Sequence, residues 1–165
     1  MRILASLPRV SVIVPIYNTL PYLPDSIYSL LEQTYENIEV ICIDDGSTDG
    51  SLEWLKDLAK CDDRLKVVSL AHVGPGQARN EGMRISTGDY VFFLDSDDLL
   101  RLDAISLLVE RAVKTNADVV VCELAYFKKN VTEALGGVES RLAVTGKGYY
   151  IERTILLAHL REFGS

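Results

Sequence analysis

Apolar residues along this chain follow two alternating patterns, short continuous runs and longer stretches with helical spacing. Continuous runs are typical of strands that are buried on both faces of a parallel sheet. They lie at residues 10–15, 38–43, 65–69, 90–94 and 118–122. Between these runs, apolar residues recur every three or four positions, which is the spacing of one face of a helix. That spacing is found in residues 23–33, 52–59 and 102–112. The alternation predicts an α/β protein, a three-layer α/β/α sandwich with a mostly parallel central sheet.

Two local signals set boundaries within this pattern. Pro15 has no N–H group to donate, so we expect the first strand to end at this residue and residues 16–18 to form a loop. The Gly-rich stretch 74–82 predicts a loop that leads into a short helix ending near residues 86–88. This stretch lacks the Gly-Lys-Ser/Thr ending of a Walker phosphate loop, so it is not one.

The apolar pattern weakens over residues 126–165. Residues 128–148 mix glycine, charges and short apolar pieces, and residues 150–160 predict a terminal helix. The sequence contains no internal repeat. We therefore expect a single domain over residues 1–165, with a poorly assigned segment at 126–165.

Acidic residues follow two of the predicted strands. Asp44-Asp45 closes the second strand, and Asp95-Ser96-Asp97 closes the fourth. In an extended chain, Asp95 and Asp97 point the same way and Ser96 points opposite. Two convergent carboxylates suit Mg²⁺ or Mn²⁺, which complete their coordination with water and substrate phosphates. The alternative is that Ser96 or Asp97 caps the helix that follows, since both residue types are good N-caps.

Polar residues also follow the first strand, where Tyr17 and Asn18 come just after Pro15. Ligands of open parallel sheets bind outside the carboxyl ends of the strands. The polar clusters after the first, second and fourth strands therefore predict one binding site at that edge. Three independent helix caps would not explain why all three clusters lie at the same edge.

Composition and charge narrow the class of ligand. The net charge of −7 argues against nucleic acid or an anionic membrane as a general partner, because such partners are bound by an excess of Lys and Arg. An acidic protein that binds phosphate groups requires a cation to offset the repulsion between the negative charges. No stretch approaches the roughly 20 apolar residues of a transmembrane helix, and an odd number of cysteines without zinc-site spacing favours a reducing compartment. We expect a cytoplasmic location, either free or peripheral at the inner face of the membrane.

Four segments, taken together, resemble the family-2 inverting glycosyltransferases of the GT-A fold. They are Val-Ser-Val-Ile-Val-Pro-Ile-Tyr-Asn at 10–18, Asp-Asp-Gly-Ser-Thr-Asp at 44–49, Ala-Arg-Asn-Glu-Gly at 78–82, and Gly-Asp-Tyr through Asp-Ser-Asp-Asp at 88–98. Each segment is weak alone, but their order and spacing match the family over residues 8–125. The resemblance implies that residues 8–125 are the nucleotide-sugar-binding core of a GT-A-type domain that is truncated in this chain. The resemblance implies a transferase that takes a nucleotide-sugar, expected to be a UDP-sugar, and acts in polysaccharide biosynthesis.

The resemblance also implies roles for individual residues. Asp45 would accept a hydrogen bond from the nucleotide base. Asp97 of the Asp-x-Asp (DXD) motif would hold the Mn²⁺ or Mg²⁺ ion that bridges the diphosphate, and Asp95 would contribute to the metal site and lie near the ribose and sugar. The implied nucleotide-sugar-binding residues are Pro15, Ile16, Tyr17, Asn18, Asp44, Asp45, Gly46, Arg79, Asp95 and Ser96.

Structural alternatives remain open for several of these residues. Tyr17 could be a partly exposed core aromatic, and Asp45 could bond the backbone of its own turn. Arg79 could pair with Glu81 or another exposed acid. We assign no role to either of the two histidines.

The general base is the part of the resemblance that the sequence does not supply. Inverting members use an aspartate of an acceptor-side segment to deprotonate the acceptor hydroxyl, and no residue here has the matching context. The glutamates that lack this context are Glu123, Glu133, Glu139 and Glu152.

The leading hypothesis is a metal-dependent inverting glycosyltransferase domain with an unidentified carbohydrate or lipid-linked acceptor. Alternatives are a donor-binding fragment without turnover and, less favoured, a nucleotidyltransferase, which would need a Gly-rich, basic loop after its first strand.

Overall fold

The computed structural model describes residues 7–122 and, for the backbone alone, residues 155–159. Strands and helices alternate from β1 to β5, and β6 follows. The strands are β1 (Val10–Ile16), β2 (Ile38–Asp44), β3 (Leu65–Ser69), β4 (Tyr90–Phe93), β5 (Val119–Cys122) and β6 (Ile155–His159). The helices are α1 (Leu23–Leu31), α2 (Ser51–Leu58), α3 (Pro75–Ile85) and α4 (Ala104–Thr115).

One sheet holds the six strands in the order β3-β2-β1-β4-β6-β5. β1 pairs in parallel with both β2 and β4, and β2 pairs in parallel with β3. β6 lies antiparallel to its neighbours β4 and β5, so β5 runs in the same direction as β1 to β4. The prediction of a mostly parallel sheet is therefore confirmed.

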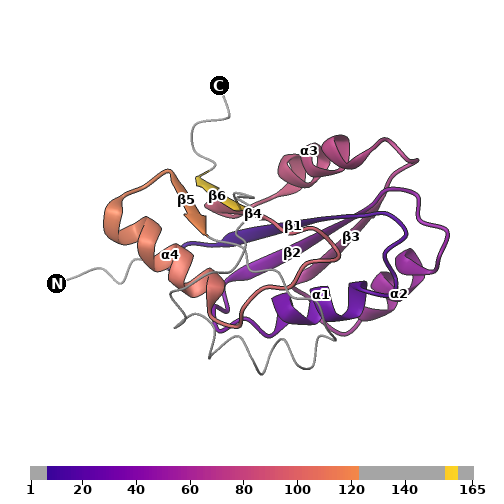
Figure 1. Cartoon of the computed structure of the whole chain (residues 1–165), viewed down its shortest axis with the longest axis horizontal. Coiled ribbons are helices and arrows are strands. Elements are labelled where there is room, and N and C mark those ends of the chain that lie inside the picture. The colour runs from indigo at the N-terminus through magenta and orange to yellow at the C-terminus, as the bar shows by residue number, and fades with distance from the viewer. Residues whose placement is uncertain (1–6, 123–154, 160–165) are drawn as a thin grey trace, which may run out of the picture.

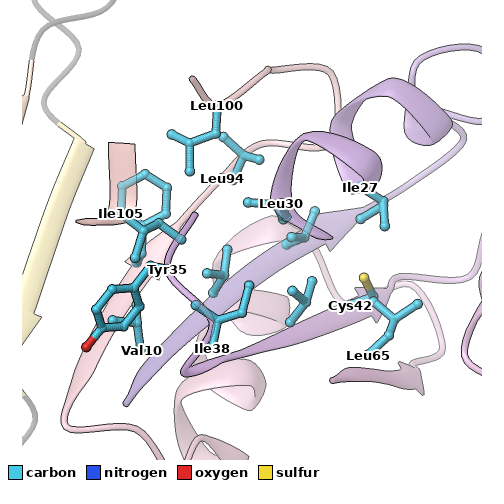
Figure 2. Packing of buried hydrophobic residues seen from close by; sticks show 14 of the residues in the cluster. Val10, Ile27, Leu30, Tyr35, Ile38, Cys42, Leu65, Leu94, Leu100 and Ile105 are labelled. Carbon is cyan, nitrogen blue, oxygen red and sulfur yellow. The ribbon is translucent and has the colours of Figure 1, made fainter. Parts of the chain in front are cut away.

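Helices cover both faces of the sheet (Figure 1). α1, α2 and α4 pack on one face, where they enclose the larger apolar core, and α3 packs on the other face over β1 and β2. Figure 2 shows part of the larger core, in which Ile27 and Leu30 of α1 lie over the strands that carry Val10 and Cys42. Because both faces are covered, every residue of β1 and β2 is buried, which is why these strands are continuous apolar runs.

β1 ends one residue later than the proline predicts. Ile13 accepts a hydrogen bond from Leu94 N at 3.1 Å on the β4 side, and Ile16 accepts one from Asp45 N at 2.8 Å on the β2 side. Alternation along the strand turns the nitrogen of Pro15 toward β4, whose pairing with β1 has already ended at Ile13. The missing N–H costs no ladder bond, so β1 continues to pair with β2 through Ile16.

The helix predicted over residues 150–160 is wrong where the structure describes this segment. Residues 155–159 form strand β6 instead. His159 pairs with Tyr90 of β4, and Ala158 pairs with Val119 of β5. A strand between β4 and β5 satisfies the backbone N–H and C=O groups of both neighbours, which a helix cannot do. Residues 128–148 lie outside the described part of the chain.

The stretch 74–82 was predicted to be a loop that enters a short helix, and the helix, α3, begins at its second residue, Pro75. Proline suits a first helical turn because its fixed φ is helical and its missing N–H would have no partner there. Ala78 and Gly82, four residues apart, are buried against the sheet. A Cβ added to Gly82 would come within 2.4 Å of Ile13 Cγ2, so the glycine lets α3 lie directly on β1.

A buried carboxylate, Glu39, joins the strands near their amino ends. Its fully buried side chain accepts hydrogen bonds from Ser11 Oγ at 2.6 Å, Thr87 N at 2.7 Å and Lys66 Nζ at 2.7 Å. These partners come from β1, the segment before β4, and β3. Burial alone would raise the pKa of Glu39, but the hydrogen bonds from Lys66, Ser11 and Thr87 outweigh burial and lower the pKa to about 2. This network lies at the edge of the sheet opposite the predicted ligand site.

Candidate functional site

The loops after β1, β2, β3 and β4 meet at the carboxyl edge of the sheet, because these four strands are adjacent and parallel. Side-chain hydrogen bonds connect the loop after β1 to those after β2 and β4, and the loop after β2 to the one after β3. The predicted convergence of distant polar clusters on one edge is confirmed. Pro15 and Ile16 are buried at this edge, and the Ile16 side chain packs in the larger core.

The loop after β1 joins its two neighbours. Asn18 adopts a left-handed backbone conformation (φ 52°), and its Oδ1 accepts a hydrogen bond from Thr48 N at 2.8 Å. Its backbone N–H donates to Ser47 Oγ at 3.0 Å. On the other side, Thr19 Oγ1 lies 2.9 Å from Ser96 Oγ in the turn after β4. Thr19 and Ser47 were not among the predicted site residues.

Asp44 and Asp45 are both buried but serve different loops. Asp44 Oδ2 accepts bonds from the backbone N–H groups of its own turn, from Gly46 at 3.2 Å and from Ser47 at 3.3 Å. Asp45 accepts short bonds from the loop after β3, from Val73 N at 2.6 Å and from Gly74 N at 2.8 Å. The alternative that Asp45 bonds its own turn is therefore wrong, since Asp44 makes those bonds. Asp45 instead fixes the loop that leads into α3.

His72 also lies at this edge, although its sequence context predicts no role for it. Its ring lies against the Tyr17 ring, with centroids 4.3 Å apart and planes 31° apart. His72 Nδ1 is also 3.5 Å from Asp45 Oδ2. Tyr17 is 47% exposed and lies outside the core, so it is not a core aromatic. A signal was available, because His72 follows the end of β3 as the other clusters follow β1, β2 and β4.

Gly46 allows the loops after β2 and β3 to touch. Its φ of +79° lies in the region that favours glycine. A Cβ at this position would also lie 3.2 Å from the backbone nitrogen of His72. Gly46 is therefore required by both its conformation and the close approach of the neighbouring loop.

The Asp-Ser-Asp motif forms a tight turn instead of continuing the strand. Asp98 N donates to Asp95 O at 3.0 Å, so the alternation of an extended chain does not apply to Asp95 and Asp97. Neither Ser96 nor Asp97 caps the next helix, because α4 begins at Ala104 and its N-cap is Asp103. The capping alternative is therefore wrong.

The two acids of the motif have different surroundings. Asp95 Oδ1 accepts a hydrogen bond from Arg79 Nη2 at 2.5 Å, and both side chains are about one third exposed. Glu81, the partner suggested by the sequence for Arg79, pairs with Arg84 instead. Asp97 is exposed, and within residues 7–122 no side chain or backbone group bonds its carboxylate.

These oxygen donors fit a cation that is shared with a ligand. Within the described residues, no group of three or more His, Cys, Asp or Glu side chains is placed to hold a metal ion by itself. The Asp97 carboxylate is nevertheless a hard oxygen donor that is exposed beside the loops of the site. Mg²⁺ and Mn²⁺ commonly take one or two carboxylates and complete their coordination with phosphates and water. The site thus fits such an ion only if a ligand supplies further oxygens.

The four glutamates considered for the general base lie outside the part of the chain that the structure describes. They are Glu123, Glu133, Glu139 and Glu152, which lack the sequence context of a general base. Among the helices that the structure describes, none has the length and apolar character needed to cross a membrane.

The sequence matches a known family over most of its length. The family described as Glycosyl transferase family 2 matches residues 11–156. The chain belongs to glycosyltransferase family 2. Family membership argues against the nucleotidyltransferase hypothesis.

Similar members of glycosyltransferase family 2 are longer proteins. Glycosyltransferase GlyA of Streptococcus pneumoniae serotype 4 is 37% identical over 127 residues, which are 77% of this chain and 18% of GlyA. The curated relatives GlyA, GlyG, EpsJ and EpsH are likewise matched over half or less of their own length. This chain therefore corresponds to only part of those proteins.

Solved structures of similar proteins confirm the GT-A fold. The S. aureus TarS 1-349 crystal structure in complex with UDP has a TM-score of 0.68 and 30% identity, over 74% of this chain and 38% of that one. Mannosyltransferase PcManGT from Pyrobaculum calidifontis, in complex with GDP-Man and Mn²⁺, has a TM-score of 0.65 and 30% identity. That match covers 70% of this chain and 35% of PcManGT.

Proposed function

We propose that this domain binds a UDP-sugar at the carboxyl edge of its sheet, together with Mn²⁺ or Mg²⁺, and transfers the sugar to an acceptor hydroxyl with inversion. One observation carries the proposal: the loops after four adjacent strands are hydrogen-bonded into a single site that has buried Asp45 at one end and exposed Asp97 at the other. Support comes from the UDP and Mn²⁺ in the complexes of similar enzymes.

The base and ribose are assigned to the end of the site formed by the loops after β1, β2 and β3. Asp45 uses both carboxylate oxygens on backbone N–H groups, and each oxygen has a further lone pair that can accept a hydrogen bond from a base. Tyr17 and His72 present adjacent, exposed rings at the same place. A planar base can bury apolar surface against such rings.

The diphosphate is assigned to the end formed by the turn after β4. Asp97 would hold the cation there, and Arg79 lies nearby through its bond to Asp95. When bound, the cation stabilises the charge that develops on the departing nucleoside diphosphate. Without a cation, an acidic protein with a net charge of −7 would repel this group.

A second candidate function is donor binding without efficient transfer. It is favoured because this chain matches half or less of the length of similar glycosyltransferases. A positioned general base typically contributes about 10²- to 10⁴-fold to the rate, and no residue of the described part is assigned that role. Such a domain would hold its donor far better than it transfers the sugar.

A thermal-shift panel of nucleotide-sugars, each with and without Mn²⁺, tests the donor-binding part of the proposal. A ligand that binds only the folded state raises its stability by mass action. We expect the largest shifts for UDP-sugars with Mn²⁺ and small shifts for either component alone. If no nucleotide-sugar raises the melting temperature with Mn²⁺ present, the proposed function is wrong. UDP release with a panel of acceptors then separates transfer from binding alone.

Asp45→Asn tests whether this residue distinguishes the base. Asparagine keeps one oxygen for the loop after β3 but loses the charge and one acceptor, so the preference for UDP over ADP should fall. A lost hydrogen bond to a buried group of this kind costs on the order of 1 to 3 kcal/mol. Calorimetric titration of both nucleotides with Mn²⁺ measures the difference. Equal weakening of UDP and ADP would mean that Asp45 acts only by fixing the loop.

A further inference from the structure

Arg79 holds one of the two acids of the Asp-Ser-Asp turn. Its guanidinium bonds Asp95 Oδ1 at 2.5 Å across 16 positions of sequence. α3 cannot shift easily, because Gly82 lies directly on Ile13 and Asp45 bonds the loop before the helix. A pair with both side chains about one third exposed contributes little to stability. The position of the Arg79–Asp95 pair in the turn after β4 therefore suggests that it acts in ligand binding and not in stability.

The ion pair changes how the turn can bind a cation. Arg79 pairs with Asp95 of this turn, while the Asp97 carboxylate is exposed and receives no bond from residues 7–122. A divalent ion is attracted less strongly to one carboxylate near a guanidinium than to two unpaired carboxylates. The described residues contain no third His, Cys, Asp or Glu side chain to complete the site. The protein alone is therefore a weak cation site, and the diphosphate oxygens must supply the missing ligands.

We propose that Arg79 is a positioning residue that makes cation binding depend on the nucleoside diphosphate. By holding Asp95, it leaves Asp97 as the ligand for the ion and keeps the turn from binding a cation tightly before the donor arrives. The ion then enters together with the diphosphate, whose negative charge offsets the guanidinium. This inference rests on the proposed function, because it assumes that the diphosphate binds at this turn.

Titration of Mn²⁺ followed by electron paramagnetic resonance, which detects the unbound ion, tests this role without any turnover. In the wild-type chain, UDP should raise the affinity for Mn²⁺ strongly. In Arg79→Met, we expect the affinity for Mn²⁺ without UDP to rise about twofold to fivefold, the range for removal of a partly exposed charge pair. The factor by which UDP raises the affinity should fall by as much, because in the UDP complex the diphosphate already offsets the guanidinium and the affinity there should not rise.

Arg84→Met is the matched control, since it removes the same charge from the same helix where the partner is Glu81. It should leave both Mn²⁺ affinities unchanged. Arg79→Met in an Asp95→Asn background separates positioning from simple repulsion, and there the rise in affinity without UDP should be smaller, because no second carboxylate is released. Arg79→Lys, which keeps the charge, should lie near the wild type if Arg79→Met proves unstable.

The results distinguish this inference from the proposed function. Absence of any UDP effect on Mn²⁺ binding in the wild-type chain would overturn the proposed function itself. A normal UDP effect that persists unchanged in Arg79→Met, or changes equally in Arg84→Met, would overturn only the role of Arg79. A rise in Mn²⁺ affinity that is equally large in the Asp95→Asn background would also overturn it, because repulsion alone would then explain the effect.

Discussion

Asp97→Asn is expected to weaken UDP binding in the presence of Mn²⁺ by about 10- to 100-fold, the range for losing a charged contact worth about 1.5 to 3 kcal/mol. Asn keeps the shape of the side chain and removes the charge. Asp97 is exposed, and within residues 7–122 nothing bonds its carboxylate, so the substitution should hardly alter the fold. Calorimetric titration of UDP with Mn²⁺ measures the loss, and UDP without Mn²⁺ should bind similarly to both proteins.

Asp63→Asn is the matched control for this experiment. Asp63 is also exposed, but it lies just before β3, at the amino end of the strands and away from the site. The control makes the same change of net charge without touching the turn after β4. Equal UDP affinities for Asp97→Asn and the wild type with Mn²⁺ would show that Asp97 does not hold the cation.

Glu39→Gln is expected to lower the free energy of unfolding at neutral pH by about 3 kcal/mol. The folded-state pKa of Glu39 is about 2, below its ordinary value of 4.5. A lowered pKa means that the charged form stabilises the fold, fully above about pH 4.5 and progressively less as the pH falls toward 2. Glutamine keeps the oxygen to which Ser11 and Thr87 both donate but places a neutral amide against Lys66.

Urea denaturation at pH 7 and at pH 3 measures this effect. The difference in unfolding free energy between the wild type and Glu39→Gln should be large at pH 7 and smaller at pH 3, where part of the wild-type stabilisation is lost. Glu110→Gln serves as control, because Glu110 is an exposed acid paired with Lys114 on α4, and its substitution should have a far smaller effect. A difference between Glu39→Gln and the wild type that is the same at both pH values would contradict this account.

The positions of the strands follow from local sequence because a strand buried on both faces must be apolar at every position. β2 could therefore be predicted nearly to the residue, with Glu39 as the exception that the buried network explains. The carboxyl-edge site was predictable for a related reason. Once the strands are parallel, residues that follow them must lie at one edge, as Asn18 and Thr48 do.

Local rules failed where partners from distant sequence decide the outcome. The proline rule misplaced the end of β1, because a missing N–H matters only when a neighbouring strand needs it. Residues 155–159 have the apolar character of either a helix or a strand, and the open edges of β4 and β5 select the strand. The alternation expected for Asp95 and Asp97 failed because the bond from Asp98 N closes a turn directly after β4.

The sequence by itself determined the alternation of strands and helices, the apolar interior of the sheet and the set of polar loops at one edge, because these depend on the spacing of residue types along the chain. Only the tertiary structure decided that Asp45 bonds the loop after β3, that His72 lies against Tyr17, and that Arg79 pairs with Asp95 instead of Glu81. Each of these contacts depends on where a neighbouring loop or helix comes to rest. That position is set by packing such as Gly82 against Ile13, which the spacing of residues does not reveal.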